Sequence, residues 1–469
     1  MNLLQTSKQN SLSLPKRLSA LGLFLILPFF TMGQFAFEGP IPKITQGFGA
    51  FGNNAFTSEF FQLTPDSTYE CSDTLRCIIT YPTGLNSTRG TVFRFPGSSN
   101  TNMTDSNYWK ESKLDREFVA SLGYVSVTMQ YNNANEYGCA YYLLDEAVRL
   151  YSNLIDTTRV GFHGISQGAA VTNWLSLKKY TNDGWGSNGR FAWPDAGASF
   201  IGWLDNWPQD IDVQSDSGLA AMPDDVLYLM TLSDWDQVPD PRTLIDMYNF
   251  MGVPDSNKEF MIIRGDTVNS YIYWATHFTL NSYENDSNQF NVYVTKHDAL
   301  DYWMGTRLLH SLMEAAWNND KTARRICMGN GDTLQTTIAG GQMRGPIVTD
   351  TPWMSMLHSW NSGLGFMGDC EAPWNMRQYV TADACFILDI PEVSAQTEVK
   401  MYPNPAQTNR QITFESSERI ISIVVFDLLG IIQQSTTDSS LTLRHSGNYV
   451  LGITFDSGRK TALRLTVID

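Results

Sequence analysis

Basic residues are few in this sequence. Its 469 residues include 32 Lys and Arg against 48 Asp and Glu, a formal net charge of -16, and no cluster of Lys or Arg interrupts the acidic excess. Nucleic acids and anionic membrane surfaces attract proteins that carry such clusters. We therefore expect no nucleic acid partner, and we attribute the acidity to solubility rather than to a cationic ligand.

Long apolar runs are also missing, with one exception near the N-terminus. The stretch from Leu18 to Phe30 follows two basic residues and precedes several small ones. This pattern predicts a secretory signal peptide over residues 1–33. A membrane anchor is the alternative, but the run is shorter than the ~20 residues that a spanning helix needs, and it contains Pro28. We expect no membrane span in the mature chain.

Cysteine is scarce, and its six residues show no spacing typical of a metal site. C-x-x-C is absent, and so is H-x-x-x-H among the six histidines, so we expect neither a metal nor another cofactor. An exported chain can form disulfides, and the five residues between Cys71 and Cys77 suit a hairpin or turn. We expect these two to pair and leave the others unassigned: Cys139, Cys327, Cys370 and Cys385.

The chain changes texture along its length. From about residue 75 to residue 320, β-rich runs alternate with helical ones, at 91–95, 124–131, 145–154, 159–163, 169–180, 198–204, 226–232 and 241–251. This alternation predicts an α/β fold with a mostly parallel sheet covered by helices on both faces. From about residue 395 short strands with turn residues predict a small β-sandwich-like domain.

These changes give the expected domain boundaries. We place the signal peptide at 1–33, the α/β domain at 34–327 and the C-terminal β domain at 393–469. The segment 328–392 is rich in Gly, Trp and Met, and we expect it to pack on the core as an extension. Tryptophans in the α/β domain either stack on a substrate or pack in the core, and we favour packing: Trp185, Trp193, Trp203 and Trp207.

One G-x-S-x-G pattern occurs in the chain, GISQG at 164–168. A strand-like run ends at residue 163, and a helical run with small first residues starts at Ala169. Strand, sharp turn and helix are the context of a nucleophile elbow, in which glycines avoid collisions and the helix N-terminus favours a developing negative charge. The pattern therefore indicates Ser166 as a nucleophile rather than as a serine in an ordinary turn.

A nucleophilic serine needs a base, and the histidines are few enough for elimination. Four lie in the strand before the serine, inside a helical run or beyond the expected core: His163, His310, His358 and His445. His277 and His297 remain, because each follows a strand-like run, SYIYWAT or FNVYVTK. Asp298 and Asp301 beside His297 are typical of a helix start, expected here over 299–317, which favours a structural role for His297.

The acid is expected after the run 226–232, since the order in this architecture is serine, acid, histidine. The usual corner there is G-x-x-D followed by small apolar residues and proline, and SDWD at 233–236 fits it with Ser in place of Gly. Asp236 is favoured over Asp234. Its carboxylate would hold the imidazole in one tautomer and stabilise the imidazolium.

An acyl-transfer site also needs donors for an oxyanion. The backbone N–H of Gln167 is one expected donor, because it follows the serine at the start of the helix. The second is expected from FPGSSN at 95–100, where Gly97 permits a close backbone approach and Ser98 is the favoured donor.

The region 91–320 resembles a group of secreted bacterial α/β hydrolases related to lipases, esterases and cutinase-like enzymes. The motifs that carry the resemblance are FRFPGSSN, GYVSVTMQYNN, GISQGAA, ATHFTLN and DALDYWMGTRLLHSLMEAAW. In similar sequences a histidine at the place of His277 stands a variable distance before the DALDY helix. The resemblance therefore implies an α/β-hydrolase fold and favours His277 over His297 as the base.

The tail resembles the C-terminal sorting domain of type IX secretion substrates. YPNP at 402–405, FDLLG at 426–430 and SGNYVL at 446–451 follow in the order of that family. Together with a signal peptide, this resemblance implies export across both membranes of a bacterial envelope, with the type IX machinery as partner of 393–469. A fibronectin-like binding module is the alternative for the same strands.

The sequence as a whole predicts a secreted or surface-located serine hydrolase acting on an ester. Ser166 would be the nucleophile, His277 the general base and acid, and Asp236 the orienting acid, through an acyl-enzyme. The alternative from another class is a non-catalytic surface binding module that keeps the fold. Convergence of these side chains in the folded chain distinguishes a site able to react from a bare scaffold.

Overall fold

The computed structural model describes residues 39–63, 75–97, 112–130, 137–196, 216–234, 236, 239, 241–277, 279–280, 297–352, 399–427, 432–456 and 460–468. They form an α/β part over 39–352 and a β part over 399–468. The expected signal peptide and the expected strand 198–204 lie outside the described residues. So do Cys71, Ser98, Trp203, Trp207, His358, Cys370 and Cys385.

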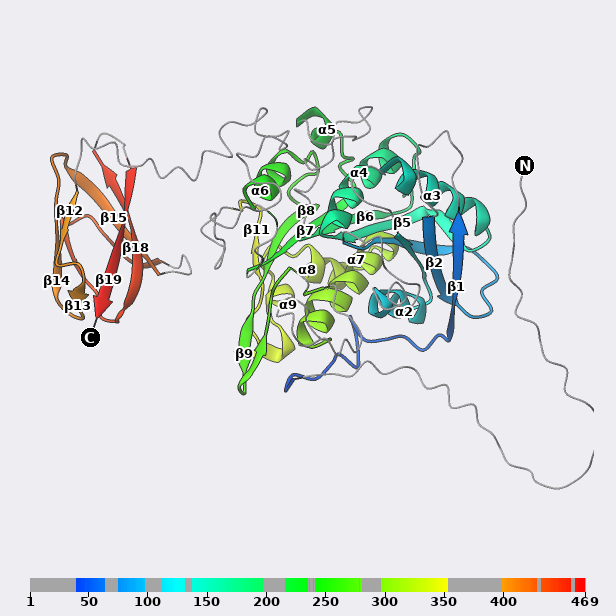
Figure 1. The fold of residues 1–469 in the computed structure, drawn as a ribbon, viewed down its shortest axis with the longest axis horizontal. Coiled ribbons are helices and arrows are strands. Elements are labelled where there is room, and N and C mark those ends of the chain that lie inside the picture. The colour runs from blue at the N-terminus through cyan, green and yellow to red at the C-terminus, as the bar shows by residue number, and fades with distance from the viewer. Residues whose placement is uncertain are drawn as a thin grey trace, which may run out of the picture. The chain divides into compact units, whose positions relative to one another are not determined.

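The α/β part is built on a nine-stranded sheet of the order β1-β2-β4-β3-β5-β6-β7-β8-β11 (Figure 1). Its strands are β1 (Phe56–Leu63), β2 (Leu75–Pro82), β3 (Arg89–Phe95), β4 (Val125–Gln130), β5 (Ile155–Ile165), β6 (Arg190–Asp195), β7 (Leu227–Ser233), β8 (Lys258–Ile263) and β11 (Ile347–Thr349). Strands β4, β3, β5, β6, β7 and β8 pair in parallel, whereas β1, β2 and β11 join antiparallel. A mostly parallel α/β sheet is thus confirmed.

Both faces of this sheet are buried under helices. One face carries α3 (Tyr137–Leu150), α4 (Gln167–Thr181) and α6 (Pro241–Phe250), and the other carries α2 (Lys113–Ser121), α7 (Arg307–Asn318) and α8 (Lys321–Cys327). Alternation along β8 shows how one strand serves both cores: Phe260 and Ile262 join the first cluster, and Met261 and Ile263 join the second. Strands buried on both faces read as continuous apolar runs, which explains their sequence.

Shorter elements complete the α/β part. They are α5 (Asp216–Ala220), the hairpin β9 (Asp266–Val268) and β10 (Tyr271–Tyr273), the π-helix η3 (Asp301–Thr306), α9 (Thr333–Thr336) and the 3-10 helix η4 (Ala339–Gly341). The expected helix 299–317 is present and runs from residue 299 to residue 318, with η3 inside it. Strand β11 lies within the expected extension 328–392 and pairs with β8, so the described start of that segment belongs to the sheet.

The β part consists of two sheets around one apolar core. The strands β12 (Lys400–Tyr402), β14 (Gln411–Glu415) and β17 (Ser440–Thr442) form one sheet. The other contains β13 (Ala406–Gln407), β19 (Lys460–Ile468), β18 (Gly447–Phe455), β15 (Ile420–Asp427) and β16 (Ile432–Thr436). Ile412 and Leu441 of the first sheet share a buried cluster with Val425 and Leu451 of the second. The expected C-terminal β domain is therefore present as a β-rich part.

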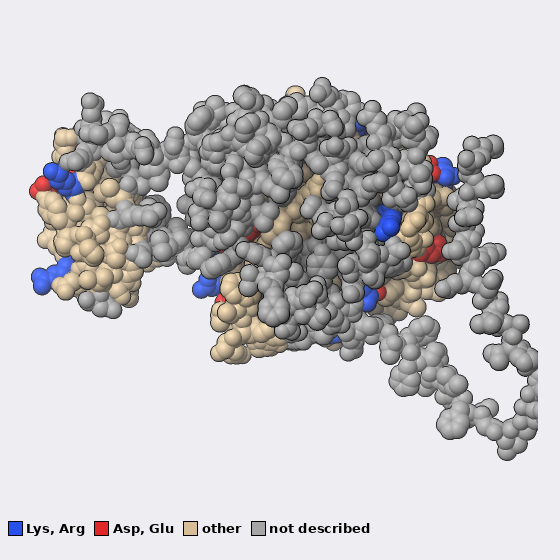
Figure 2. Space-filling model, viewed as in Figure 1, with Lys and Arg blue, Asp and Glu red and all other residues tan. Residues whose placement is uncertain are grey.

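Charged side chains are scattered over the described part of the surface. Figure 2 shows Lys, Arg, Asp and Glu at separate points of the visible face rather than as a broad patch of one sign. Within the described ranges, no helix has the length and apolar character needed to cross a membrane.

Two cysteine side chains are described, Cys77 in β2 and Cys327 in α8. Both are free thiols with no exposed surface. Burial raises the pKa of each thiol well above its ordinary value, which keeps both protonated and unreactive. The structure therefore does not show the expected disulfide of Cys77 with Cys71, which lies outside the described residues.

Candidate active site

The turn between β5 and α4 is tighter than the sequence indicates. Strand β5 continues to Ile165 and α4 begins at Gln167, so Ser166 alone forms the corner. Its backbone has a φ of 57° and a ψ of -125°, a combination that non-glycine residues rarely adopt. The Ser166 N–H donates to the carbonyl of Asp195 at the end of β6, at 2.9 Å. Such strain persists only where the surroundings hold it, and it is typical of functional sites.

The two glycines of the motif are required by close backbone approaches. A Cβ atom on Gly164 would lie 2.1 Å from the carbonyl oxygen of Gly168. A Cβ atom on Gly168 would lie 2.2 Å from the carbonyl oxygen of Phe95, the last residue of β3. Both distances are well below van der Waals contact, so any side chain would push α4 away from the sheet and displace Ser166.

The structure brings together the three side chains singled out as a triad. The Oγ atom of Ser166 lies 2.8 Å from Nε2 of His277, and Nδ1 of His277 lies 3.0 Å and 3.1 Å from the two carboxylate oxygens of Asp236. Because a carboxylate only accepts, Nδ1–H of the imidazole donates to Asp236, and neutral Nε2 then accepts from the serine hydroxyl. The side chains of His277 and Asp236 are 3% and 0% exposed, so water hardly competes for this bond.

Local hydrogen bonds fix the loops that carry the acid and the histidine. The N–H of Asp236 donates to the carbonyl of Ser233 at 3.0 Å, closing a turn directly after β7. In the loop after β10, the N–H of Thr276 donates to Thr279 Oγ1 at 2.7 Å, and that hydroxyl donates to the carbonyl of Trp274 at 3.0 Å. These hydrogen bonds fix the turn that carries His277.

The alternative acid, Asp234, has a different partner. Its Oδ1 accepts from the N–H of Gly265 at 3.1 Å. Burial raises the pKa of Asp234 to about 7, only partly offset by the Gly265 bond and by Arg264. The carboxylate within hydrogen-bond distance of His277 is that of Asp236.

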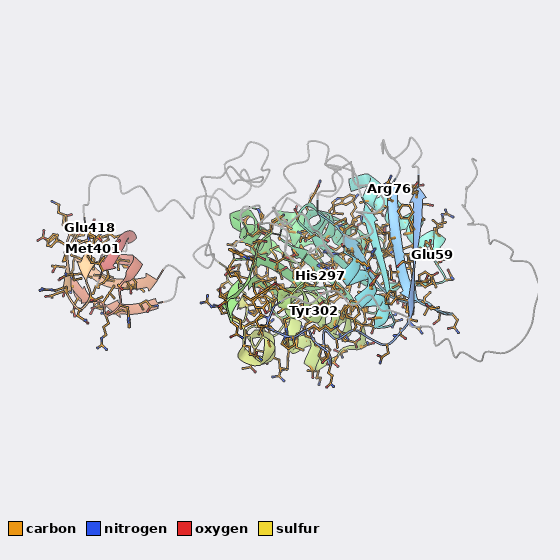
Figure 3. The ribbon with its side chains drawn as sticks, turned by 60° about the horizontal axis from the view of Figure 1, so that its bottom comes forward. Glu59, Arg76, His297, Tyr302, Met401 and Glu418 are labelled. Atoms are coloured by element: carbon orange, nitrogen blue, oxygen red, sulfur yellow. The ribbon has the colours of Figure 1, made fainter. Side chains whose placement is uncertain are left out.

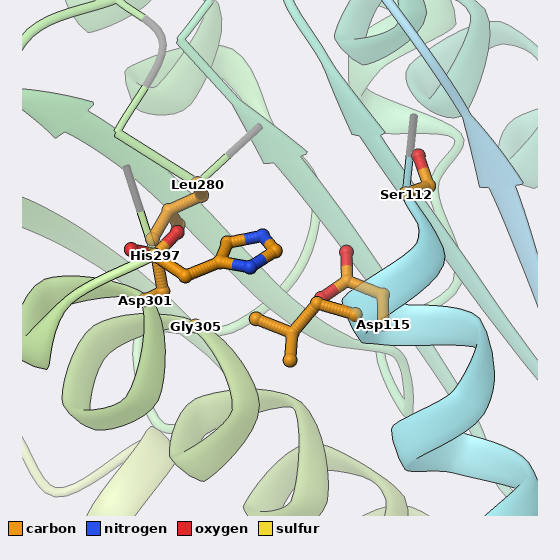
Figure 4. Close-up of a pocket in the computed structure, with 7 residues that line it drawn as sticks. Ser112, Asp115, Leu280, His297, Asp301 and Gly305 are labelled. Carbon is orange, nitrogen blue, oxygen red and sulfur yellow. The ribbon is translucent and has the colours of Figure 1, made fainter. Parts of the chain in front are cut away.

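The alternative base, His297, is buried among other partners. It is 5% exposed and lines a cavity with room for about one water molecule, together with Ser112, Leu114, Asp115, Leu280, Asp301 and Gly305 (Figure 4). His297 and Tyr302, labelled near the middle of the α/β part in Figure 3, are both buried. At the helix start, Oδ1 of Asp298 accepts from the N–H of Leu300 at 2.8 Å.

The expected oxyanion donors fall partly within the described residues. Gln167 is the first residue of α4, and the first N–H groups of an α-helix have no acceptor inside the helix. Gly97 comes shortly after β3 and lies close to the nucleophile: a Cβ atom on it would be 3.3 Å from Cβ of Ser166. Ser98, the favoured second donor, lies outside the described residues, so its role stays a prediction.

The sequence alone did not indicate a buried cluster of Arg94, Asp115, His163 and Trp193. Nε of Arg94 lies 3.1 Å from the Asp115 carboxylate, and the ring of His163 stacks on Trp193 with centroids 4.1 Å apart. Burial, followed by the charge of Arg94, lowers the pKa of His163 well below its usual range, so this histidine stays neutral. Burial raises the pKa of Asp115, against the opposing charges of Arg94 and Arg116. The partners come from β3, β5, β6 and α2, which no local pattern connects.

Asp195 also lies at the site without having been singled out. It is the last residue of β6, the strand beside β5, and no strand was expected over these residues. An aspartate that closes the short apolar run RFAWPD was the available signal, because polar residues at the carboxyl ends of parallel strands gather at the site edge.

Comparisons with known proteins add no identification. The sequence matches no protein-family model and no curated protein. Among the described residues, no group of three or more His, Cys, Asp or Glu side chains is arranged to hold a metal ion.

Proposed function

We propose that the α/β part is a serine hydrolase that cleaves a carboxylic ester through an acyl-enzyme. The observation that carries the proposal is the relay of 2.8 Å from Ser166 Oγ to His277 Nε2 and 3.0 Å from His277 Nδ1 to Asp236. Nucleophile, base and orienting acid within hydrogen-bond reach are the signature of an activated serine.

The fold proposed for this part is that of the α/β hydrolases. Supporting it are the parallel order β4-β3-β5-β6-β7-β8, the antiparallel β2 and the sharp strand-to-helix turn after β5. The acid follows β7 and the histidine comes later in the chain, which is the order of residues in that fold. No comparison supplies the substrate, so the proposal stops at the ester class.

The proposed reaction follows from the relay. His277 Nε2 takes the proton of Ser166 as Oγ attacks the ester carbonyl, and the N–H of Gln167 with one from the loop after Gly97 stabilises the oxyanion. The imidazolium, held by Asp236, then protonates the leaving alcohol as the acyl-enzyme forms. Water, deprotonated by His277, attacks the acyl carbonyl; the acid product leaves and Ser166 regains its proton.

The test compares the two histidines and the two aspartates by hydrolysis of a p-nitrophenyl ester. We expect His277→Ala and Asp236→Asn to lose several powers of ten in kcat. His297→Ala and Asp234→Asn serve as matched controls and are expected to stay close to the wild type. Inactive His297→Ala with active His277→Ala would reverse the assignment of the base. Full activity in all four variants would show that the triad is assigned wrongly, and a wild-type protein without activity would favour a non-catalytic binding module.

For the β part we propose a role in export, as a sorting domain for type IX secretion that delivers the protein to the medium or the cell surface. It has an apolar core of its own and contains none of the triad residues. Asn404 of its YPNP motif accepts from the N–H of Thr466 at 3.1 Å, which ties the motif to the last strand. Deleting 393–469 is expected to abolish secretion in a cell that has this machinery while the retained chain still hydrolyses the ester. Normal secretion of the shortened chain would contradict the role.

A further inference from the structure

Asp195 is a buried acid at the end of β6 with a specific set of partners. It is 2% exposed, and its Oδ1 accepts from the Thr231 hydroxyl at 2.6 Å. That hydroxyl oxygen in turn accepts from Nε1–H of Trp193 at 2.8 Å. Thr231 and Trp193 have no exposed surface, so the chain from indole to hydroxyl to carboxylate is closed to water.

The backbone of the same residue joins the strand ends that carry the nucleophile and the acid. Asp195 pairs with Ile165 of β5 on one side and with Thr231 of β7 on the other. Its carbonyl accepts the N–H of Ser166 at 2.9 Å, and the N–H of Ala196 donates to the Thr231 carbonyl at 3.0 Å. A shift of Asp195 therefore moves the corner at Ser166 directly.

Charges from three other elements act on the Asp195 carboxyl. Burial raises its pKa to about 7, the Thr231 hydroxyl and Arg94 of β3 lower it, Asp236 after β7 raises it and His277 lowers it again. The same interactions operate in reverse, because coupling between two charges is mutual. A negative Asp195 stabilises a positive His277, and a neutral Asp195 does not.

We propose that Asp195 is a positioning residue of the site, a second carboxylate that acts through Ser166 and His277. Its carbonyl holds the nucleophile amide at 2.9 Å, and its side chain, fixed by the Thr231 hydroxyl, adds a second carboxyl group whose charge acts on His277. This inference rests on the proposed hydrolase function. It assigns the reaction a dependence on Asp195 that the three residues of the relay do not account for.

The test uses the full chain and the pH profile of kcat/KM with a p-nitrophenyl ester. Asp195→Asn keeps the shape but removes the charge, so we expect a loss of about tenfold in kcat with little change in KM, since about 1.4 kcal/mol of imidazolium stabilisation is tenfold in rate. The wild-type profile is expected to rise as Asp195 ionises near pH 7, and Asp195→Asn is expected to lose that rise. A purely structural role predicts a loss of activity without this change in the profile.

Two further variants keep the inference testable if Asp195→Asn folds poorly. Thr231→Val removes the hydroxyl that donates to the ionised Asp195 carboxylate and is expected to lower kcat at neutral pH. Thr231→Ser keeps a hydroxyl and is expected to keep the wild-type profile. Glu259→Gln is the matched control: Glu259 is another buried acid whose pKa burial raises to about 7, but its partners are Gln335 and Asn330. Its profile is expected to match the wild type.

The outcomes separate this inference from the proposed function. If Ser166→Ala is inactive while Asp195→Asn and Thr231→Val reproduce the wild-type kcat and pH profile, the inference is wrong and the hydrolase stands. If Ser166→Ala hydrolyses the ester as fast as the wild type, the proposed function is wrong, whatever the Asp195 variants show. A Thr231→Ser profile equal to that of Thr231→Val would also overturn the inference.

Discussion

Replacing Gly168 by alanine tests the elbow through a single methyl group. The new Cβ would lie 2.2 Å from the Phe95 carbonyl oxygen and 2.4 Å from that of Pro96, both backbone atoms that cannot rotate away. A carbon–oxygen contact needs about 3.3 Å, so the start of α4 and the end of β3 must separate by about 1 Å. We expect the free energy of unfolding to fall by about 1–3 kcal/mol, the usual cost of overpacking.

The same displacement reaches the chemistry, because Gly97 and Ser166 face each other across this contact. A misplacement of about 1 Å can cost on the order of 100-fold in rate, which is the expected loss in kcat/KM. The measurements are urea unfolding and ester hydrolysis. Gly305→Ala is the control, since its Cβ would meet Leu280 at 3.5 Å, an ordinary contact. Wild-type stability and rate in Gly168→Ala would refute the described elbow.

Two predictions concern stability. Asp195, Asp234 and Glu259 have folded-state pKa values raised to about 7, so they contribute stability below their unfolded pKa values that is lost as pH rises to 7. Glu259→Gln is expected to reduce the decline in unfolding free energy between pH 4.5 and 7 by up to about 3 kcal/mol, and an unchanged slope would contradict the assignment. Arg94→Met leaves the Asp115 carboxylate buried without its 3.1 Å partner, and we expect it to lower the free energy of unfolding by about 3–5 kcal/mol in urea. Adding Asp115→Asn is expected to restore part of this loss. A double variant whose loss equals the sum of the two single losses would contradict the pairing.

The sequence predicts those features of the molecule that depend on neighbouring residues in the chain. The alternation of β-rich and helical runs predicts the parallel sheet, and the glycines around Ser166 predict a corner because their positions allow no side chain. Asp236 was favoured over Asp234 by its place in the corner pattern after β7, and in the structure it is the carboxylate beside His277.

Long-range contacts could not be read in the same way. His277 and His297 both follow strand-like runs, and only the acidic residues after His297 and the family resemblance favour His277. The difference in their surroundings arises from chain segments far apart. His297 shares its cavity with Asp115 of α2, and Arg94 pairs with that same aspartate. The run that ends at Asp195 is short and was not singled out, and the expected strand 198–204 lies outside the described residues. The order of strands in the sheet, with β6 beside β7, is what brings Asp195 near the loop of Asp236.

Covalent labelling with a fluorophosphonate, followed by mass spectrometry of the intact chain and its peptides, tests directly whether Ser166 is an activated nucleophile. We expect one adduct, on Ser166, formed as Oγ displaces fluoride and His277 takes the proton. Ser166→Ala is expected to take up no label, and His277→Ala to react far more slowly at unchanged fold. A wild-type protein that stays unlabelled, or that carries the label on another residue, would contradict the claim that Ser166 is an activated nucleophile.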